Sequence, residues 1–332
     1  MNRKTTLLML ALALVLALAA IRAPEARAEA DDFQPFFRMD MDGGKAWEGK
    51  VYNLRLLTRG KYKFGKILER YGVDAGFVPD TTGLDALNIS GSAQFSMDQL
   101  RDLAATLRKR ADGKAIYIVD LRGESHVFLN GNPISWYCEH NWGNYGKTLE
   151  EVRQDEAMRF APLVDSTIRA YGVVHDQRTG GKKIKVKSWT TEAELVAVEG
   201  FGYLRLPCPD HAFPPAGQID AFIEFVKGID MDNTWLHFHC HAGVGRTGIF
   251  MMLYDKMKNP GVAMQDILVR QALTGSEYPV THGRSYHRST SFHGQLQAEK
   301  NRMTPLLFQY VEENWESGYA VPWSQWLAAG EH

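Results

Sequence analysis

The chemistry of this chain is concentrated in Cys240 and Arg246, which are separated by five residues that include two glycines. A cysteine thiolate is a nucleophile, and an arginine presents a planar pair of donors that can bind two oxygens of one phosphate group. Gly243 and Gly245 permit a tight backbone that turns successive amides toward one point. The pattern predicts a loop that binds a tetrahedral dianion, with Cys240 attacking phosphorus to form a cysteinyl-phosphate.

The residues on either side of this loop indicate how it is positioned. The run WLHFHC, residues 235–240, predicts a short buried strand, and the apolar run after Thr247 predicts a core helix. The loop therefore joins a strand to a helix N-terminus, whose partial positive charge stabilises an anion and favours the thiolate form of Cys240. We expect Thr247 to donate a hydroxyl hydrogen bond to the sulfur.

The reaction also needs a proton donor for the leaving oxygen, and Asp210 is the predicted general acid. It lies in the sequence CPDH, residues 208–211, after a strand predicted at 202–207. A carboxyl group beside the phosphate could protonate the leaving alkoxide and later accept a proton from water. The alternative is a local role for Asp210, as an Asx turn or a helix cap before Pro214.

This stretch has two other interpretations, a metal site and a structural cysteine. His237, His239 and His241 alternate and could indicate a metal site, but no carboxylate or cysteine cluster is spaced to complete one. We therefore expect no metal and no other cofactor. A purely structural cysteine would leave the glycines, the arginine and the following helix unexplained.

The string HCHAGVGRTG, residues 239–248, resembles the signature of the protein tyrosine phosphatase superfamily. Further segments are similar to the cysteine phytases, the tyrosine-phosphatase-like inositol polyphosphate phosphatases of bacteria. These segments are DLRGESHVFLNGNPISWY (120–137), YLRLPCPDHAFP (203–214), DILVRQ (266–271) and ENWESGYAVPWSQWL (313–327). The resemblance covers most of residues 84–327.

The resemblance implies an α/β fold: a protein tyrosine phosphatase-like domain with a mixed, partly parallel sheet flanked by helices, and a small β-barrel subdomain. It also implies stepwise, metal-independent hydrolysis of myo-inositol hexakisphosphate and lower inositol polyphosphates. Two alternatives stay open, a secreted protein-tyrosine or phosphoinositide phosphatase and an inactive phosphate-binding module. Lipid phosphatases of this superfamily tend to carry lysines where this chain has His241 and Val244.

The resemblance further implies which residues bind substrate. Within the loop they are His241, Ala242, Gly243, Val244, Gly245 and Thr247. Outside it they are Arg38, Asp120, His175, His211, His293 and Lys300. His175 and His293 stand near positions that are lysine in related phytases, so their charge depends on pH and suggests better binding in mild acid. Asp120 has a second interpretation, as part of an ion-pair network that braces the phosphate loop.

Local patterns predict further elements. Residues 115–121 (AIYIVDL) predict a buried parallel strand that ends near Asp120. Capping boxes predict three helix starts, at Ser96 with Gln99, Thr148 with Glu151, and Thr191 with Glu194. Residues 172–189 predict a hairpin that turns at Gly180-Gly181. We assign about 170–190, together with part of 46–85, to the small β subdomain.

The N-terminus has the layout of a secretory signal peptide, with Arg3 and Lys4 before an apolar run and small residues up to Ala28. We expect a signal peptide at 1–28 and a secreted or periplasmic bacterial domain at 29–332, with an uncleaved anchor as the alternative. Removal of residues 1–28 would lower the formal net charge from -1 to about -4, which disfavours nucleic acid as a partner. The expected partner is a small inositol polyphosphate, with no membrane contact after cleavage.

The three cysteines leave the redox chemistry open. Cys138 and Cys208 could pair, Cys208 could trap an oxidised Cys240 as a reversible disulfide, or both could stay free.

Overall fold

The computed structural model describes residues 33–40, 51–56, 68–69, 71–280 and 291–330. The chain divides into two units, Met1–Gln34 and Pro35–His332, and every described helix and strand belongs to the second. The predicted signal peptide lies outside the described residues. No described helix is both long enough and apolar enough to cross a membrane.

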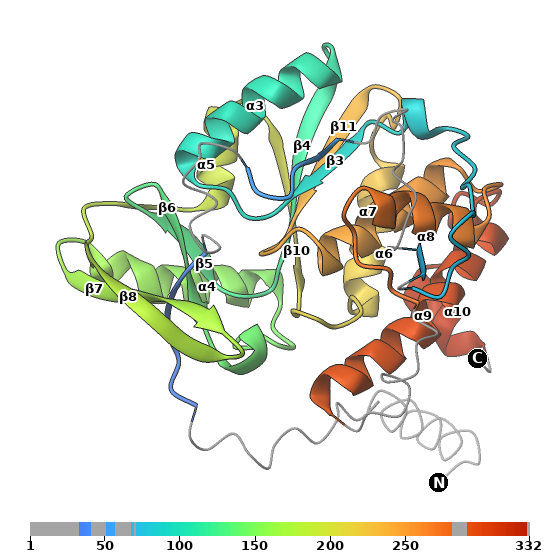
Figure 1. Cartoon of the computed structure of the whole chain (residues 1–332). Helices are drawn as coiled ribbons and strands as arrows, with labels where there is room; N and C mark the ends of the chain where they lie inside the picture. Colours follow the sequence, from blue (N-terminus) through green and yellow to red (C-terminus); the bar gives the residue numbers. More distant parts are fainter. Residues whose placement is uncertain (1–32, 41–50, 57–67, 70, 281–290, 331–332) are drawn as a thin grey trace, which may run out of the picture. The chain divides into compact units, whose positions relative to one another are not determined.

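Two sheets form the framework of the second unit (Figure 1). The five-stranded sheet runs, in spatial order, β10 (Gly202–Cys208), β4 (Ala115–Arg122), β11 (Thr234–His239), β3 (Ile89–Ser92) and β2 (Arg55–Leu56). The six-stranded sheet runs β8 (Gln177–Lys185), β7 (Thr167–Val174), β1 (Phe36–Met39), β6 (Asn132–Tyr137), β5 (His126–Leu129) and β9 (Trp189–Thr190).

The five-stranded sheet confirms the expected mixed, partly parallel arrangement. Strands β10, β4, β11 and β3 are parallel, and only β2 is antiparallel to its neighbour. Every residue of β11 is buried, as expected for a strand of a sheet that helices cover on both faces. The parallel strands end at one edge, so β11 delivers its last residues, and the loop that follows, to that edge.

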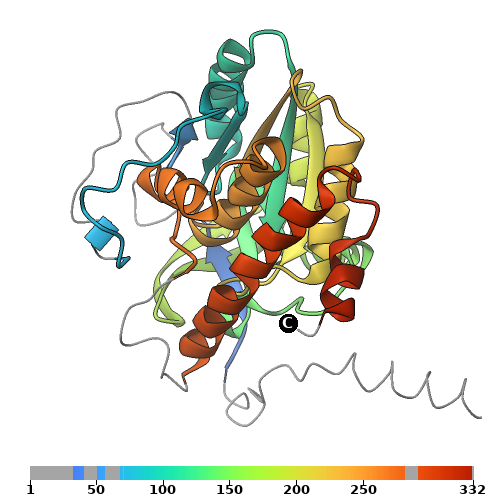
Figure 2. The ribbon, with the colours of Figure 1, turned by 90° about the vertical axis from the view of Figure 1, so that its right-hand side faces the viewer.

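Helices cover both faces of this sheet (Figures 1 and 2). On one side pack α3 (Met97–Ala111) and α5 (Glu192–Val198). On the other pack α6 (Ala216–Lys227), α7 (Gly245–Lys258), α9 (Phe292–Asn314) and α10 (Trp323–Ala329), with α8 (Met264–Leu273) beside α7. Helix α4 (Leu149–Phe160) packs on the six-stranded sheet through Phe160. Short 3-10 helices occupy Leu84–Ala86, Glu139–Asn141 and Ala161–Leu163.

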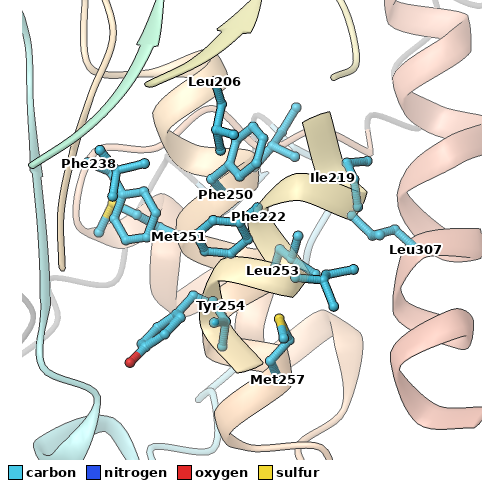
Figure 3. Packing of buried hydrophobic residues seen from close by; sticks show 14 of the residues in the cluster. Leu206, Ile219, Phe222, Phe238, Phe250, Met251, Leu253, Tyr254, Met257 and Leu307 are labelled. Carbon is cyan, nitrogen blue, oxygen red and sulfur yellow. The ribbon is translucent and has the colours of Figure 1, made fainter. Parts of the chain in front are cut away.

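The core between the sheet and α7 fixes the helix that follows the phosphate loop (Figure 3). Phe222 of α6 contacts Phe250 of α7 and Phe238 of β11 edge-on, with ring centroids 5.3 and 5.8 Å apart. All three rings are fully buried. Since truncation of such a residue costs about 3–5 kcal/mol, this packing holds the start of α7 firmly against β11.

The three predicted capping boxes are confirmed at the starts of α3, α4 and α5. At α3, the Ser96 hydroxyl accepts from the Gln99 amide at 3.2 Å, and the Gln99 side chain accepts from the Ser96 amide at 2.9 Å. Each cap satisfies helix amides that would otherwise lack partners and contributes about 1 kcal/mol.

The hairpin was predicted with its turn in the wrong place. Strands β7 and β8 do pair, but the two-residue turn is His175-Asp176, and Gly180-Gly181 lies inside β8. His175 and Asp176 have φ of 49° and 59°, the left-handed conformation that a two-residue hairpin turn of this type requires. The register shifts between Ala170 and Gly172, so the glycines lie near a bulge and not at the turn.

The six-stranded sheet is open among the described residues, so the expected barrel is not confirmed. The hairpin assigned to the small β subdomain belongs to this sheet. Arg55 and Leu56, from the range 46–85, pair instead with β3 of the five-stranded sheet.

Candidate active site

A cavity of about 410 Å³ opens above the loop between β11 and α7. It brings together most of the residues predicted to act there: Arg38, His175, Asp210, His211, Cys240, His241, Ala242, Val244, Gly245, Arg246, His293 and Lys300. Of the other predicted residues, Gly243 shapes the loop, while Asp120 and Thr247 are fully buried away from the cavity lining.

The loop is held in shape by hydrogen bonds to its carbonyl groups. Three consecutive carbonyls accept from outside the loop: His241 from the Gln94 amide (3.0 Å), Ala242 from Asn53 Nδ2 (2.9 Å) and Gly243 from an Arg55 nitrogen (2.8 Å). Because these carbonyls bond outward, the loop amides are free to turn inward. One of them, the Gly243 N-H, donates to the Cys240 sulfur at 3.2 Å. Such a ring of amides stabilises negative charge on sulfur or phosphate.

Gly243 cannot be replaced without moving the loop. Its φ is 71°, and a Cβ there would lie 2.3 Å from the carbonyl carbon of Ser92 at the end of β3. The close approach to β3 therefore requires glycine.

Arg246 lies at the bottom of the cavity, clamped by Glu124. Its NH1 is 2.7 Å from Glu124 Oε2 and 3.1 Å from the Cys208 carbonyl, and its NH2 is 3.3 Å from Glu124 Oε1. Its Nε is buried and has no hydrogen-bond partner within the described part of the chain. The guanidinium is therefore fixed along one edge, while a donor remains for an anion in the cavity.

Asp210 faces the same guanidinium, with Oδ1 3.0 Å from Arg246 NH2. Burial tends to raise the pKa of Asp210, but Arg246 and then His211 outweigh it and hold the pKa at about 2. Asn141 Nδ2 donates to Asp210 Oδ2 at 3.1 Å, and the Trp142 indole donates to the Asp210 carbonyl at 2.8 Å. The loop after β6 therefore positions the predicted general acid.

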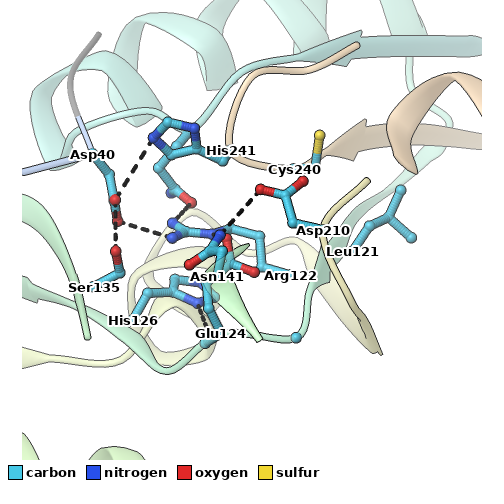
Figure 4. Close-up of polar contacts among 12 residues, drawn as sticks. Asp40, Leu121, Arg122, Glu124, His126, Ser135, Asn141, Asp210, Cys240 and His241 are labelled. Atoms are coloured by element: carbon cyan, nitrogen blue, oxygen red, sulfur yellow. Dashed lines mark hydrogen bonds and ion pairs between the residues drawn. The ribbon is translucent and has the colours of Figure 1, made fainter. Parts of the chain in front are cut away.

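A buried cluster of alternating charges lies beneath the cavity (Figure 4). Arg122 contacts Asp40 at 3.0 Å and Glu124 at 2.8 Å, while Arg38 contacts Asp40 at 2.8 Å. Burial tends to raise the pKa of Asp40, but Arg122 and Arg38 outweigh it and hold the pKa at about 2. His241 Nε2 lies 3.7 Å from Asp40, so the loop is joined to this cluster.

Asp120 belongs to a second buried network, which favours the structural interpretation over substrate contact. It binds the Tyr203 hydroxyl at 2.8 Å and Arg205 Nε at 3.2 Å, and it lies 3.3 Å from His126 Nε2. Burial and Arg122 oppose a charge on His126, but Asp120 raises its pKa to about 9. The carboxylate of Asp120 is thus fully used in bracing β4 and β10.

His237, His239 and His241 do not converge on one point. His237 lies between the hydroxyls of Ser90 and Ser92, at 2.8 and 3.0 Å, and His241 faces the cavity. A different group, Asp120, Glu192 and His239, has ligand atoms within 4.8 Å of one another, a spacing that a metal ion could use. Since Arg205, Tyr203 and His126 already bind or approach its carboxylates, this group is adequately described as a charge-compensated network.

The structure contradicts one expectation about the sulfur chemistry and, of the open alternatives for the cysteines, contains free thiols. Thr247 is fully buried, and its hydroxyl has no hydrogen-bond partner among the described residues, so the expected bond to Cys240 is not formed. Cys138, Cys208 and Cys240 are all free thiols in this structure. Burial raises the pKa of Cys208 well above its usual range, which makes it a poor nucleophile.

The mouth of the cavity is built from less buried side chains. Lys300 of α9 pairs with Glu277 at 2.8 Å. His211 and His293 face each other with ring centroids 5.0 Å apart, and His293 is also 6.0 Å from His140. His175 lines the cavity from the turn between β7 and β8.

The chain is similar to several known proteins. The family model for protein tyrosine phosphatase-like phytases, whose description names inositol hexakisphosphate, matches residues 119–258. The tandemly repeated phytase of this type from Mitsuokella multacida is 37% identical, over 89% of this chain and 49% of that one, with a TM-score of 0.78. The phytase from Bdellovibrio bacteriovorus is 26% identical, over 89% of this chain and 95% of that one, with a TM-score of 0.64.

Residues 119–258, which match that family model, carry Cys240, Arg246 and Asp210, so this part of the chain is similar to the protein tyrosine phosphatase-like phytases. A second Mitsuokella multacida structure, a myo-inositol phosphatase of this family in complex with myo-inositol-(1,3,4,5)-tetrakisphosphate, is 36% identical over 90% of this chain, with a TM-score of 0.78. Among curated proteins, "Effector protein hopD2" of Pseudomonas syringae pv. tomato is 26% identical over 75% of this chain. The chain spans about half the length of the Mitsuokella proteins and of the effector protein.

Several residues of the site gave no signal in the sequence. Asn53, Arg55 and Gln94 support the loop carbonyls, and Asn141 and Trp142 position Asp210. Arg55 is buried, which lowers its pKa to about 10, and it was missed because its surroundings lacked a clear periodicity. These residues act through contacts with segments that are far away in the chain, and local sequence patterns do not predict such contacts.

Proposed function

We propose that this chain hydrolyses phosphomonoesters of inositol polyphosphates, from myo-inositol hexakisphosphate downward, through a cysteinyl-phosphate intermediate. The observation that carries the proposal is the convergence of Cys240, Arg246 and Asp210 on one cavity above an amide-lined loop. The structural neighbour in complex with an inositol tetrakisphosphate supports the substrate class.

In the first step, the phosphate enters the loop and Cys240 attacks phosphorus in line with the leaving oxygen. The inward amides and the free Nε of Arg246 stabilise the three equatorial oxygens, where charge accumulates in the transition state. Glu124 keeps the guanidinium in place, so little reorganisation accompanies the reaction.

Asp210 must be protonated to act as the acid, although its pKa beside Arg246 is about 2. The low value comes from the contact with Arg246. A bound phosphate dianion takes over that contact and repels a second negative charge, so it raises the pKa of Asp210. Substrate binding therefore creates the acid form that protonates the leaving alkoxide.

In the second step, Asp210, now a carboxylate, accepts a proton from water, which attacks the cysteinyl-phosphate and releases inorganic phosphate. Cys240 leaves as a thiolate, which the Gly243 amide stabilises. Arg38, His211, His293 and Lys300 surround the space above the loop, where they are placed to bind the other phosphates of the ring.

The test measures inorganic phosphate release, with a chelator present, from myo-inositol hexakisphosphate and from a phosphotyrosine peptide. We expect release from the inositol by the wild type, and loss of release in Cys240→Ser while substrate binding is retained. Release from the peptide alone would replace this proposal with a protein phosphatase. Binding without turnover of either compound would instead indicate a phosphate-binding module.

A further inference from the structure

Histidines are concentrated around the cavity. Five of the eleven histidines of the chain line it: His140, His175, His211, His241 and His293. Three of these, His140, His211 and His293, have neighbouring rings at the mouth, with centroids 5.0 and 6.0 Å apart. Phe292 stacks on the His140 ring at 3.8 Å and so fixes its plane. We call these three residues the imidazole cluster.

The permanent charges of the described cavity lining compensate one another. Arg38 pairs with Asp40 at 2.8 Å, Arg246 with Glu124 at 2.7 Å and with Asp210 at 3.0 Å, and Lys300 with Glu277 at 2.8 Å. The three lining cations Arg38, Arg246 and Lys300 are matched by the three lining carboxylates Asp176, Asp210 and Glu277. Among the described lining residues, positive charge beyond this balance therefore has to come from histidines.

We propose that the imidazole cluster binds the outer phosphates of the substrate as imidazolium ions, and that substrate binding is therefore coupled to proton uptake. The proposal rests on the proposed function, because it concerns the same cavity and a substrate with several phosphates. It adds His140, which neither the sequence analysis nor the comparisons assign, to the substrate-binding residues.

The surroundings of the rings orient them at the mouth of the cavity. His140 Nδ1 lies 3.1 Å from Asp176, which can accept its N-H and orient the ring. His293 is near Lys300 and the other two histidines, with Asp176 as a nearby anion. Burial, and then His211 and His140, lower the pKa of His293 below 6.5. A polyphosphate placed among these rings reverses the sign of the local potential and favours their charged forms.

His211 faces a carboxylate as well as a histidine. Its amide donates to Asp210 Oδ1 at 3.1 Å, and its φ of 63° marks a tight turn that holds the ring at the mouth. Asn141 and Trp142, which position Asp210, directly follow His140 in the chain. The same short segment therefore positions the general acid and one ring of the cluster.

The sign of the pH dependence follows from linkage. A histidine whose pKa is higher in the complex contributes affinity that is complete below its pKa in the free protein and is lost as pH rises through its pKa in the complex. For His293 the loss begins below pH 6.5. Titration of the ligand acts in the opposite direction, because a phosphate monoester gains negative charge near pH 6 and would then bind cations more tightly.

Calorimetry in two buffers of different ionisation enthalpy tests the proposal, with the Cys240→Ser protein and myo-inositol hexakisphosphate as the probe. We expect proton uptake on binding and an affinity that falls about tenfold per pH unit for each proton taken up. Inorganic phosphate, which occupies only the loop, should take up fewer protons. Binding of inorganic phosphate reports the protonation of Asp210 alone, so proton uptake with hexakisphosphate that is no larger than with inorganic phosphate would overturn the inference and leave the proposed function standing.

Two substitutions of His293 in the same background separate charge from shape. His293→Lys carries a permanent positive charge, so its affinity for hexakisphosphate should be kept at about pH 8. On binding it should take up about one proton fewer than the Cys240→Ser protein. His293→Gln should also take up one proton fewer, but its affinity at about pH 5 should fall about tenfold. If both variants keep the pH dependence of the parent, the cluster does not bind as proposed. Absence of hexakisphosphate binding at every pH would overturn the proposed function as well.

Discussion

The floor and the mouth of the cavity use charge in different ways. The floor consists of Asp40, Arg122, Glu124 and Arg246, whose side chains are at most 1% exposed and form a network of contacts of 2.7–3.3 Å. The mouth consists of the imidazole cluster with Lys300 and Glu277, where side-chain exposure reaches 27% at His140 and 35% at Glu277. The floor fixes geometry with permanent charges, whereas the mouth adapts its charge to the ligand.

Burial explains the difference. A charge without water needs partners of opposite sign close by, so the floor consists of arginines and carboxylates that cannot change state near neutral pH. At the mouth, water can screen a single charge, so imidazoles can gain and lose protons at low cost. The floor suits an invariant reaction centre, and the mouth suits substrates that lose phosphates one at a time.

The largest expected effect comes from the phosphate-binding arginine of the floor. Arg246→Lys removes the planar fork and should lower kcat by about 10³-fold or more, because the transition-state charge loses its donors. Lys300→Gln at the mouth should raise KM about tenfold with little change in kcat. Steady-state kinetics with myo-inositol hexakisphosphate measure kcat and KM for both variants. Similar losses of kcat in the two variants would contradict the distinction between floor and mouth.

The next largest effect is expected on the free energy of unfolding, which should depend more on the floor than on the mouth. Glu124→Gln leaves Arg122 and Arg246 short of a buried counter-charge and should cost about 3–5 kcal/mol of unfolding free energy. Glu277→Gln, the matched change at the mouth, removes a partly exposed pair and should cost less than about 1 kcal/mol. Urea denaturation at neutral pH measures both values. A smaller cost for Glu124→Gln than for Glu277→Gln would contradict the assignment of floor and mouth.

Acid should weaken the floor in a different pH range from the mouth. Asp40 has a pKa of about 2 in the folded chain against an ordinary 3.8, so its contribution is complete above pH 3.8 and is lost as pH falls toward 2. The difference corresponds to about 2 kcal/mol. Asp40→Asn should be less stable than wild type near pH 5 and lose less stability between about pH 4 and 2. Parallel acid denaturation curves for the two proteins would exclude this role.

The smallest effect is expected at Trp142, which follows His140 of the mouth closely in the chain and positions Asp210. Trp142→Phe removes the indole hydrogen bond to the Asp210 carbonyl, so kcat should fall less than about tenfold and stability by about 1 kcal/mol. Trp326→Phe is the control, since its indole donates to Glu313 outside the cavity. It should lose similar stability without loss of kcat, and an equal loss of kcat in both variants would show a general packing effect.

The reactive loop and the elements on either side of it could be predicted from the sequence, because the relevant signals are local. The spacing of Cys240 and Arg246 and the apolar runs around them predict the strand, the loop and the helix, which the structure contains as β11 and α7. The three capping boxes are local as well, since each satisfies amides of its own helix. Asp210 was predicted from the need for a proton donor, and His211 and Lys300 were predicted by resemblance. All three lie at the cavity.

The rest depended on contacts between segments far apart in the chain. Glycine pairs favour turns in general, but the pairing of β7 with β8 put the turn at His175-Asp176. Asp120 stands at the ligand edge of the sheet, yet Tyr203 and Arg205 of the neighbouring strand enclose it. The sequence by itself determined the reactive loop, because one strand, one turn and one helix build it. Only the tertiary structure decided what supports that loop and which histidines gather above it, because burial and charge compensation depend on neighbours that folding brings together.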